Sequence, residues 1–219
     1  ENGYKEDDKI KVDYQNAQGD QANLQTISEQ LVGKNDLVLA IATPSAQSLA
    51  TASSEVPILF TAVTDPLSAD LVDSLEKPGG NLTGTSDQAP IDKQVELLGQ
   101  AVPGAKTVGI LYTTSERNSE VQVEEAKKLL EKAGYKVVLK GISTTNDVQD
   151  AATSLMKDVD AVFVPTDNTV ASTMTLIGEL SIEYKVPVIG GSTDMIDAGG
   201  LLTYGTNYEA LGRQTAKMA

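Results

Sequence analysis

The chain has 219 residues, of which 40% are hydrophobic and 22% charged, and its 31 acidic and 17 basic residues give a net charge of −14. It contains no histidine and no cysteine, which excludes disulfides, thiolate zinc sites, cysteine nucleophiles and imidazole-based catalysis. The acidity argues against binding to nucleic acid or to an anionic membrane surface, because both need basic patches.

The first half of the chain alternates predicted strands and helices. Period-2 alternation or short apolar runs predict strands at Lys9–Tyr14, Asp36–Ile41, Pro57–Phe60 and Asn81–Ser86. Helical spacing and capping residues predict helices at Gln21–Val32 (closed by Gly33), Ala46–Ser53, near Leu67–Leu75, and Ile91–Ala101.

The second half continues the same rhythm. Strands are predicted at Thr107–Tyr112, Lys136–Lys140, Ala161–Pro165, Val186–Gly190 and Leu201–Tyr204. Helices are predicted at Ser119–Ala133 (capped by Gly134), Asn146–Met156, Val170–Tyr184 and Tyr208–Ala219. This alternation predicts an α/β fold with parallel, doubly wound sheets. Because two such series meet near residues 84–87 without a flexible linker, we expect two Rossmann-like lobes joined by short hinge strands.

Hydroxyl side chains are dense in the loops that follow five predicted strands. These loops span residues 42–47, 61–66, 113–119, 166–169 and 191–195, and three of them contain Thr-Asp. Amide groups at a helix start, together with Ser or Thr hydroxyls, can hold a carboxylate, and a nearby Asp can hold an ammonium group. Two facing lobes would thus form a clamp for a zwitterion, because ligands of open α/β sheets bind beyond the carboxyl ends of the strands.

Each of these loops also has a purely structural interpretation. Ser, Thr, Asp and Asn are the preferred N-cap residues, so any single loop can be a helix cap, and Asp65 directly before Pro66 fits that role best. Asp167 and Asp194 are stronger candidates for a ligand contact, because a buried carboxylate without a cation is costly. Ser45 lacks a histidine or lysine base and the G-x-S-x-G elbow, and no phosphate-binding glycine loop occurs.

Several of these segments together resemble a family of bacterial ABC-transporter substrate-binding proteins, of the tryptophan/tyrosine type. The resemblance rests on AIATPSAQ (40–47), PILFTAVTDP (57–66), PGGNLTGTS (78–86), VPTDNTVA (164–171), YGTNY (204–208) and LGRQ (211–214). It implies a type I periplasmic-binding fold, with residues 1–86 and 200–219 in the N-terminal lobe and 87–199 in the C-terminal lobe. The residues 1–4 resemble the end of a first helix, so a first strand and helix are expected to be missing, and the last helix to be cut after Ala219.

The resemblance also implies the function and the site. The expected protein is a monomeric, non-enzymatic component of an importer, in the periplasm or as a surface lipoprotein, that delivers an amino acid to a membrane permease without metal or cofactor. Thr43, Ser45 and Ala46 would meet the ligand carboxylate, with Ala62 and Thr64 on the same lobe. Asp167 and Asp194 would hold the amino group from the other lobe, and Ser115 and Asn118 would be closure contacts.

Two other functions remain open from the sequence. The same fold serves as the effector domain of sensors and regulators, although a transcription regulator would carry a basic helix-turn-helix ahead of it. A doubly wound enzyme is the third hypothesis, which the lack of histidine, cysteine and a phosphate loop disfavours.

Overall fold

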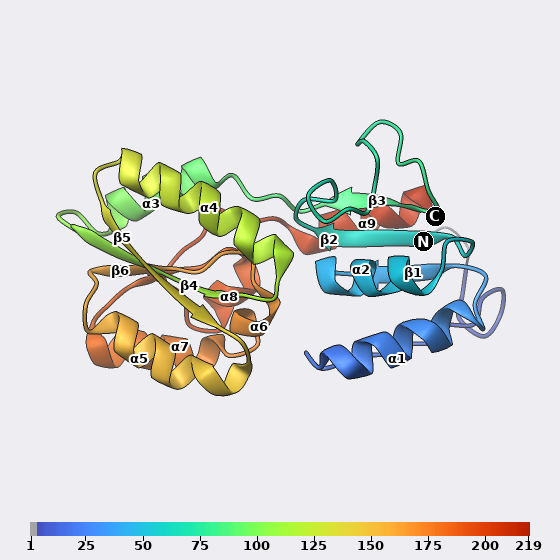
Figure 1. Cartoon of the computed structure of the whole chain (residues 1–219), viewed down its shortest axis with the longest axis horizontal. Coiled ribbons are helices and arrows are strands. Elements are labelled where there is room, and N and C mark those ends of the chain that lie inside the picture. The colour runs from blue at the N-terminus through green and yellow to red at the C-terminus, as the bar shows by residue number, and fades with distance from the viewer. Residues whose placement is uncertain (1–3) are drawn as a thin grey trace.

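The computed structural model describes residues 4–219 and contains two parallel sheets, each with its own helices (Figure 1). The first sheet has the order β1-β2-β3, with β1 Val38–Ile41, β2 Ile58–Val63 and β3 Leu82–Ser86. The second has the order β5-β4-β6-β7, with β4 Thr107–Thr113, β5 Lys136–Ile142, β6 Ala161–Phe163 and β7 Val188–Ile189. The predicted α/β class with two parallel sheets is confirmed.

Helices cover both faces of the second sheet. Its helices are α3 Ile91–Ala101, α4 Arg117–Lys132, α5 Val148–Met156, α6 Asn168–Ala171, α7 Met174–Tyr184 and α8 Thr193–Asp197, with a 3₁₀ turn at Thr145–Asp147. One apolar cluster joins α3 and α4 to the sheet, and a second joins α5 and α7 to its other face (Figure 1). Strands buried on both faces explain the continuous apolar runs that the sequence shows in β4 and β6.

The first sheet carries α1 Gln21–Val32, α2 Thr43–Ala52 and α9 Tyr208–Met218. Ile58 and Phe60 of β2 pack in the cluster that includes α2, whereas Thr61 hydrogen-bonds Thr215 of α9. Because successive side chains of a strand point to opposite faces, α2 and α9 lie on opposite sides of this sheet. Helix α9 packs on β2 and β3.

Strand β1 has one uncovered face. Val38 and Ala40 are buried, whereas Leu39 and Ile41 remain 55% and 56% exposed. This alternation is the period of a strand with one solvent-facing side. The two exposed side chains therefore form an apolar strip at the edge of the first sheet.

The prediction of a strand at Lys9–Tyr14 is wrong. That segment is extended chain with an isolated bridge between Glu6 and Ile10, and its apolar side chains Ile10, Val12 and Tyr14 are exposed. A strand needs a neighbour to pair its backbone groups, and no strand within residues 4–219 runs alongside this one. A helix end was expected in residues 1–4, of which residues 1–3 lie outside the described chain.

The predicted helix near Leu67–Leu75 is also wrong, because the segment is a series of turns. Asp65 accepts hydrogen bonds from the amides of Leu67 and Ser68, as a cap would, but Asp70 adopts a left-handed conformation (φ 56°). Ala69 and Leu71 are nevertheless buried. Local apolar contacts therefore fix this segment without a helical backbone.

Other differences are small and have local causes. Val170–Tyr184 is split into α6 and α7, because the hydroxyls of Ser172 and Thr173 donate to carbonyls of the preceding turn. The predicted strand Leu201–Tyr204 is reduced to a single bridge, in which Leu202 pairs in parallel with Ile189. The short helix α8 was not predicted. The lobe boundaries at residues 86 and 200 stay a prediction.

Candidate ligand-binding site

The carboxyl ends of the strands in each lobe face the other lobe (Figure 1). Two segments connect the lobes, one between β3 and α3 and one between Leu202 and α9. A direct contact also links them, because Nε of Arg117 at the start of α4 donates to the carbonyl of Ser68, 3.3 Å away. We call the strand-end segments 42–46, 61–66, 86–88, 113–119, 166–170 and 191–195 the inter-lobe face.

Helix α2 begins on this face with an unsatisfied hydroxyl. Thr43 is 2% exposed, and its Oγ1 has no hydrogen-bond partner in the part of the chain that the structure describes. The first amides of a helix lack intrahelical acceptors, and Pro44 has no amide hydrogen to satisfy. Ser45 is half-buried and Ala46 fully buried in the same turn. This helix start presents donors, and a partial positive charge, towards the other lobe.

The backbone leading into the site is strained at two alanines. Ala42 has φ 74° and ψ 157°, and Ala62 has φ 54° within a β-bulge of β2. The amide of Ala42 donates to the carbonyl of Thr61, so the two strained positions sit on neighbouring strand ends. Non-glycine residues rarely adopt positive φ, and such strain concentrates at functional sites.

Two buried polar residues, Thr64 and Asp87, lie at the carboxyl ends of β2 and β3 in the N-terminal lobe. Thr64 is 2% exposed and donates from Oγ1 to Oδ1 of Asp87, 3.3 Å away. Asp87 directly follows β3 and also accepts from the hydroxyl of Tyr208 at 2.9 Å. Burial raises the pKa of Asp87, and burial together with the Asp87 charge raises the pKa of Tyr208. Asp87 was not predicted from the sequence, although it lies in the loop that directly follows the predicted strand Asn81–Ser86, a position equivalent to that of the five predicted loops.

Asp167 is buried inside the C-terminal lobe and fully hydrogen-bonded there. Its Oδ1 accepts from Thr113 Oγ1 and the amide of Val170, and its Oδ2 accepts from the amide of Thr113 and Ser119 Oγ, at 2.6–2.8 Å. Four donors fill the acceptor capacity of a carboxylate. Burial and the nearby charge of Glu116 raise the pKa of Asp167 to about 6.

Glu116 is a second buried carboxylate, which sequence analysis did not single out. It accepts five hydrogen bonds, from the amides and side chains of Asn168 and Thr169 and from Asn118 Nδ2. Burial alone would raise the pKa of Glu116, but these bonds outweigh it and lower the pKa. Glu116 and Asp167 together hold the start of α6 against the start of α4.

The remaining predicted residues occupy different positions on the inter-lobe face. Asn118 is buried, and its Nδ2 also donates to the carbonyl of Thr166 while its Oδ1 has no partner among residues 4–219. Ser115 and Asp194 are exposed. Asp194 lies near enough to Tyr208 to raise the pKa of that phenol. All nine residues predicted from the sequence lie in these strand-end segments, and Asp167 is fully hydrogen-bonded within its own lobe. Their contact with a ligand stays a prediction.

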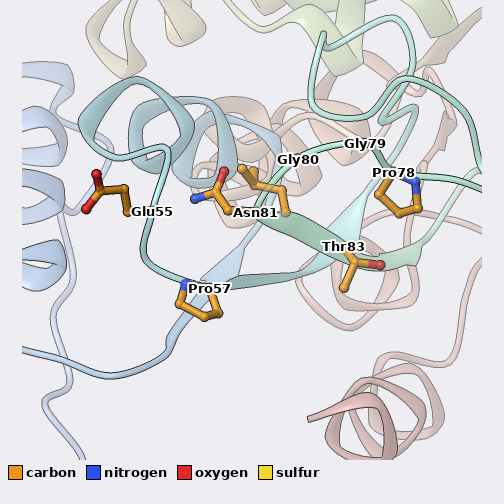
Figure 2. A pocket seen from close by; sticks show the side chains of 8 residues that line it. Glu55, Pro57, Pro78, Gly79, Gly80, Asn81 and Thr83 are labelled. Carbon is orange, nitrogen blue, oxygen red and sulfur yellow. The ribbon is translucent and has the colours of Figure 1, made fainter.

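A hollow of about 560 Å³ lies elsewhere, at the amino ends of β2 and β3 (Figure 2). It is lined by Glu55, Pro57, Pro78, Gly79, Gly80, Asn81, Leu82 and Thr83. Asn81 Nδ2 is already bonded to the carbonyls of Ser53 and Val56. The hollow lies at the end of the strands opposite to the inter-lobe face, and we assign it no ligand.

Residues 4–219 contain no cluster of three or more acidic side chains that could hold a metal ion. No helix of the described chain has the length and apolar character needed to cross a bilayer.

Known proteins resemble this chain over nearly all of its length. A tyrosine-binding protein of Clostridioides difficile (strain R20291) is 45% identical over 218 residues, and the chain spans 63% of that relative's length. The crystal structure of an ABC domain from Streptococcus pneumonia in complex with L-Trp is 44% identical. It superposes with a TM-score of 0.93, covering 95% of this chain and 73% of that one.

A second solved structure is almost equally similar in sequence but superposes less well. The ligand-free, open structure of a substrate binding protein with adhesive properties from Clostridium difficile is 46% identical and has a TM-score of 0.65, covering 99% of this chain and 74% of that one. At nearly equal sequence identity, this chain superposes better on the L-Trp complex than on the ligand-free, open structure. The fold is that of type I periplasmic-binding proteins, as predicted. The sequence model of ABC transporter substrate binding proteins matches residues 1–219, and the chain belongs to this family.

Proposed function

We propose that this protein captures an aromatic amino acid, tyrosine or tryptophan, between its two lobes and hands it to the membrane permease of an ABC importer. Two relatives of more than 40% identity support the ligand class, one being a tyrosine-binding protein and the other a complex with L-Trp. In this proposal the protein is a binding protein without enzymatic activity. It works outside the cytoplasm, in the periplasm or as a surface lipoprotein.

The observation that carries the proposal is the start of α2. A buried Thr43 hydroxyl without a partner sits beside helix amides that have no intrahelical acceptor. Leaving a buried hydroxyl unpaired costs about 1–3 kcal/mol, which a ligand carboxylate would recover as hydrogen bonds. A carboxylate is also favoured by the positive end of the helix dipole.

Further contacts follow from the inter-lobe face. Ser45 and Ala46 supply the rest of the α2 turn, and Ala62 and Thr64 supply the neighbouring strand end. From the other lobe, Ser115, Asn118 and Asp194 are proposed to meet the ligand on closure. Asp167 is proposed to support this wall rather than to touch the ligand, because its four acceptor sites are already filled.

The test is thermal denaturation of the full chain with each of the twenty amino acids, followed by calorimetric titration of those that stabilise it. A ligand present at about one hundred times its Kd should add about 2.7 kcal/mol of stability, a clear rise in Tm. We expect rises with L-tyrosine or L-tryptophan. If no aromatic amino acid raises the Tm, the proposed ligand class is wrong.

A matched pair of variants tests the role of α2. Thr43→Val keeps the shape of the side chain but removes its hydroxyl, and should weaken amino acid binding about tenfold or more. Thr51→Val is the control, because Thr51 is exposed near the other end of the same helix and bonds only the carbonyl of Gln47. Equal affinities in the two variants would contradict a carboxylate site at the start of α2.

A further inference from the structure

Asp87 is a buried carboxylate at the junction of the two lobes. It is 4% exposed, directly follows β3, and its amide donates to the carbonyl of Val63. It thus begins the first segment that connects the lobes, on the inter-lobe face and next to the proposed carboxylate site.

No cation balances this carboxylate within the described chain. Its side-chain partners are two neutral hydroxyls, Thr64 on Oδ1 and Tyr208 on Oδ2, and the causes of its pKa shift among the described residues include no lysine or arginine. A buried, unpaired carboxylate is costly, and burial raises the pKa of Asp87 accordingly. Each carboxylate oxygen can accept two hydrogen bonds, so Asp87 keeps capacity that Asp167 has used up.

Asp87 and the start of α2 lie on either side of the carboxyl end of β2. β1 and β3 flank β2 in the first sheet, and α2 follows β1 as Asp87 follows β3. Ala42, directly before α2, donates from its amide to the carbonyl of Thr61, and Thr64, directly after β2, donates to Asp87. The proposed carboxylate site and Asp87 are therefore linked through one strand end, as the carboxylate and ammonium groups of a single ligand require.

Tyr208 holds the Asp87 carboxylate in place from the second connecting segment. It is the first residue of α9, and its hydroxyl donates to Oδ2 of Asp87 at 2.9 Å. The neighbouring Thr206 hydroxyl donates to the carbonyl of Asp87 at 3.4 Å. Because the pKa of Tyr208 is raised, its hydroxyl stays protonated and remains a donor. Both connections between the lobes therefore meet at this one residue.

We propose that Asp87 recognises the ammonium group of the bound amino acid and that Tyr208 is its positioning residue. The assignment rests on the function proposed above and adds what that function leaves open, namely which group makes the site require an amine. The protein then discriminates an amino acid from the carboxylic acid that lacks only the amino group. Because Asp87 lies where the lobes join, the same contact links ligand binding to the arrangement of the lobes.

The test compares L-tyrosine with 3-(4-hydroxyphenyl)propanoate, its analogue without the amino group, by calorimetric titration of the full chain. In Asp87→Asn we expect the affinity for L-tyrosine to fall about 10- to 100-fold, while the analogue binds as well as before or better. The control Asp92→Asn makes the same charge change at an exposed position of α3 and should leave both affinities unchanged. Retained L-tyrosine affinity in Asp87→Asn, or an equal loss for both ligands, would overturn the assignment.

Two variants of Tyr208 test whether its hydroxyl positions Asp87 or only stabilises the fold. Tyr208→Phe should reduce the preference for L-tyrosine over the analogue several-fold, and Tyr208→His, which can still donate from a ring nitrogen, should recover part of it. An unchanged preference in Tyr208→Phe would overturn the positioning role. If the unmodified chain binds no amino acid, the proposed function fails, and this assignment fails with it; if it binds L-tyrosine but Asp87→Asn does so equally well, the assignment alone fails.

Discussion

The side chain of Arg117 reaches from the first turn of α4 to the carbonyl of Ser68 in the other lobe. The same guanidinium pairs with Glu120 one turn further along α4, which fixes its direction. Away from the two connecting segments, this contact is a hydrogen bond directly between the lobes. It can exist only while the lobes are close together.

Removing this contact should speed ligand release. In Arg117→Gln we expect the dissociation rate of L-tyrosine to rise about two- to fivefold, because an exposed charged hydrogen bond contributes about 0.5–1 kcal/mol. Stopped-flow displacement measures it. Lys127→Gln, which removes an exposed ion pair with Glu131 on the same helix, is the control. Equal dissociation rates in both variants would show that Arg117 does not stabilise the closed arrangement.

The strain at Ala42 predicts a stabilising substitution. Its φ of 74° with ψ of 157° belongs to a region that essentially only glycine adopts, so Ala42→Gly should raise the free energy of unfolding by about 1 kcal/mol. Urea denaturation followed by circular dichroism measures the change. Ala50→Gly, inside α2, should do the opposite and lower it by about 1 kcal/mol. A loss of stability in Ala42→Gly would argue against strain at this position.

Asp167 predicts a specific dependence of stability on pH. Burial and the charge of Glu116 raise its pKa from 3.8 to about 6, so the folded protein favours the protonated form. The stability from this group is fully present below about pH 3.8 and is lost as the pH rises through about 6. Relative to Asp167→Asn, the unmodified chain should therefore gain on the order of 2 kcal/mol between about pH 7 and about pH 4.

The measurement is a series of urea denaturation curves for both proteins across this pH range. Using the difference between the two proteins cancels the contributions of other carboxylates, such as Asp147 and Asp160, whose lowered pKa values give the opposite trend. A pH-independent difference would mean that Asp167 titrates near its ordinary value.

Glu116 should act on Asp167 through its charge. Glu116→Gln removes the negative charge that helps to raise the pKa of Asp167, so the pH window of the preceding experiment should move to lower pH. The amide of the new side chain also faces donors at Asn168 and Thr169, and we expect a loss of about 1–3 kcal/mol at neutral pH. Glu120→Gln, more exposed on α4, should change neither. An unmoved window would indicate that burial alone raises the Asp167 pKa.

Most of the fold was predictable because strong periodic patterns specify it. The helices Gln21–Val32 and Ile91–Ala101 have the predicted bounds, since their apolar spacing and flanking residues agree. Lys9–Tyr14 alternates as a strand should, but alternation cannot create the neighbour that a strand requires. Leu67–Leu75 has helical spacing, but tertiary packing of Ala69 and Leu71 selects turns instead.

The position of the strand-end loops was predictable from the sequence, but the hydrogen-bond partners of their side chains were not. Parallel strands put all their carboxyl ends on one edge, so the rule of reading strand-end loops found the inter-lobe face. It could not tell that Thr113 and Ser119 would bind the carboxylate of Asp167, because they lie 54 and 48 residues away in the chain; only the cap bond from the amide of Val170 is local. Asp87 also follows a predicted strand, but its bond to Tyr208, 121 residues away, cannot be inferred from local pattern.

The apolar strip on β1 bears on the colloidal behaviour of the chain. Leu39 and Ile41 lie on β1, whose outer edge pairs with no strand of residues 4–219, and two copies of a protein can associate on such an edge. At neutral pH the net charge of −14 makes molecules repel each other, and this repulsion vanishes near the isoelectric point of about 4.3. Turbidity should therefore appear first in mildly acidic buffer, and replacing Leu39 by lysine should delay it.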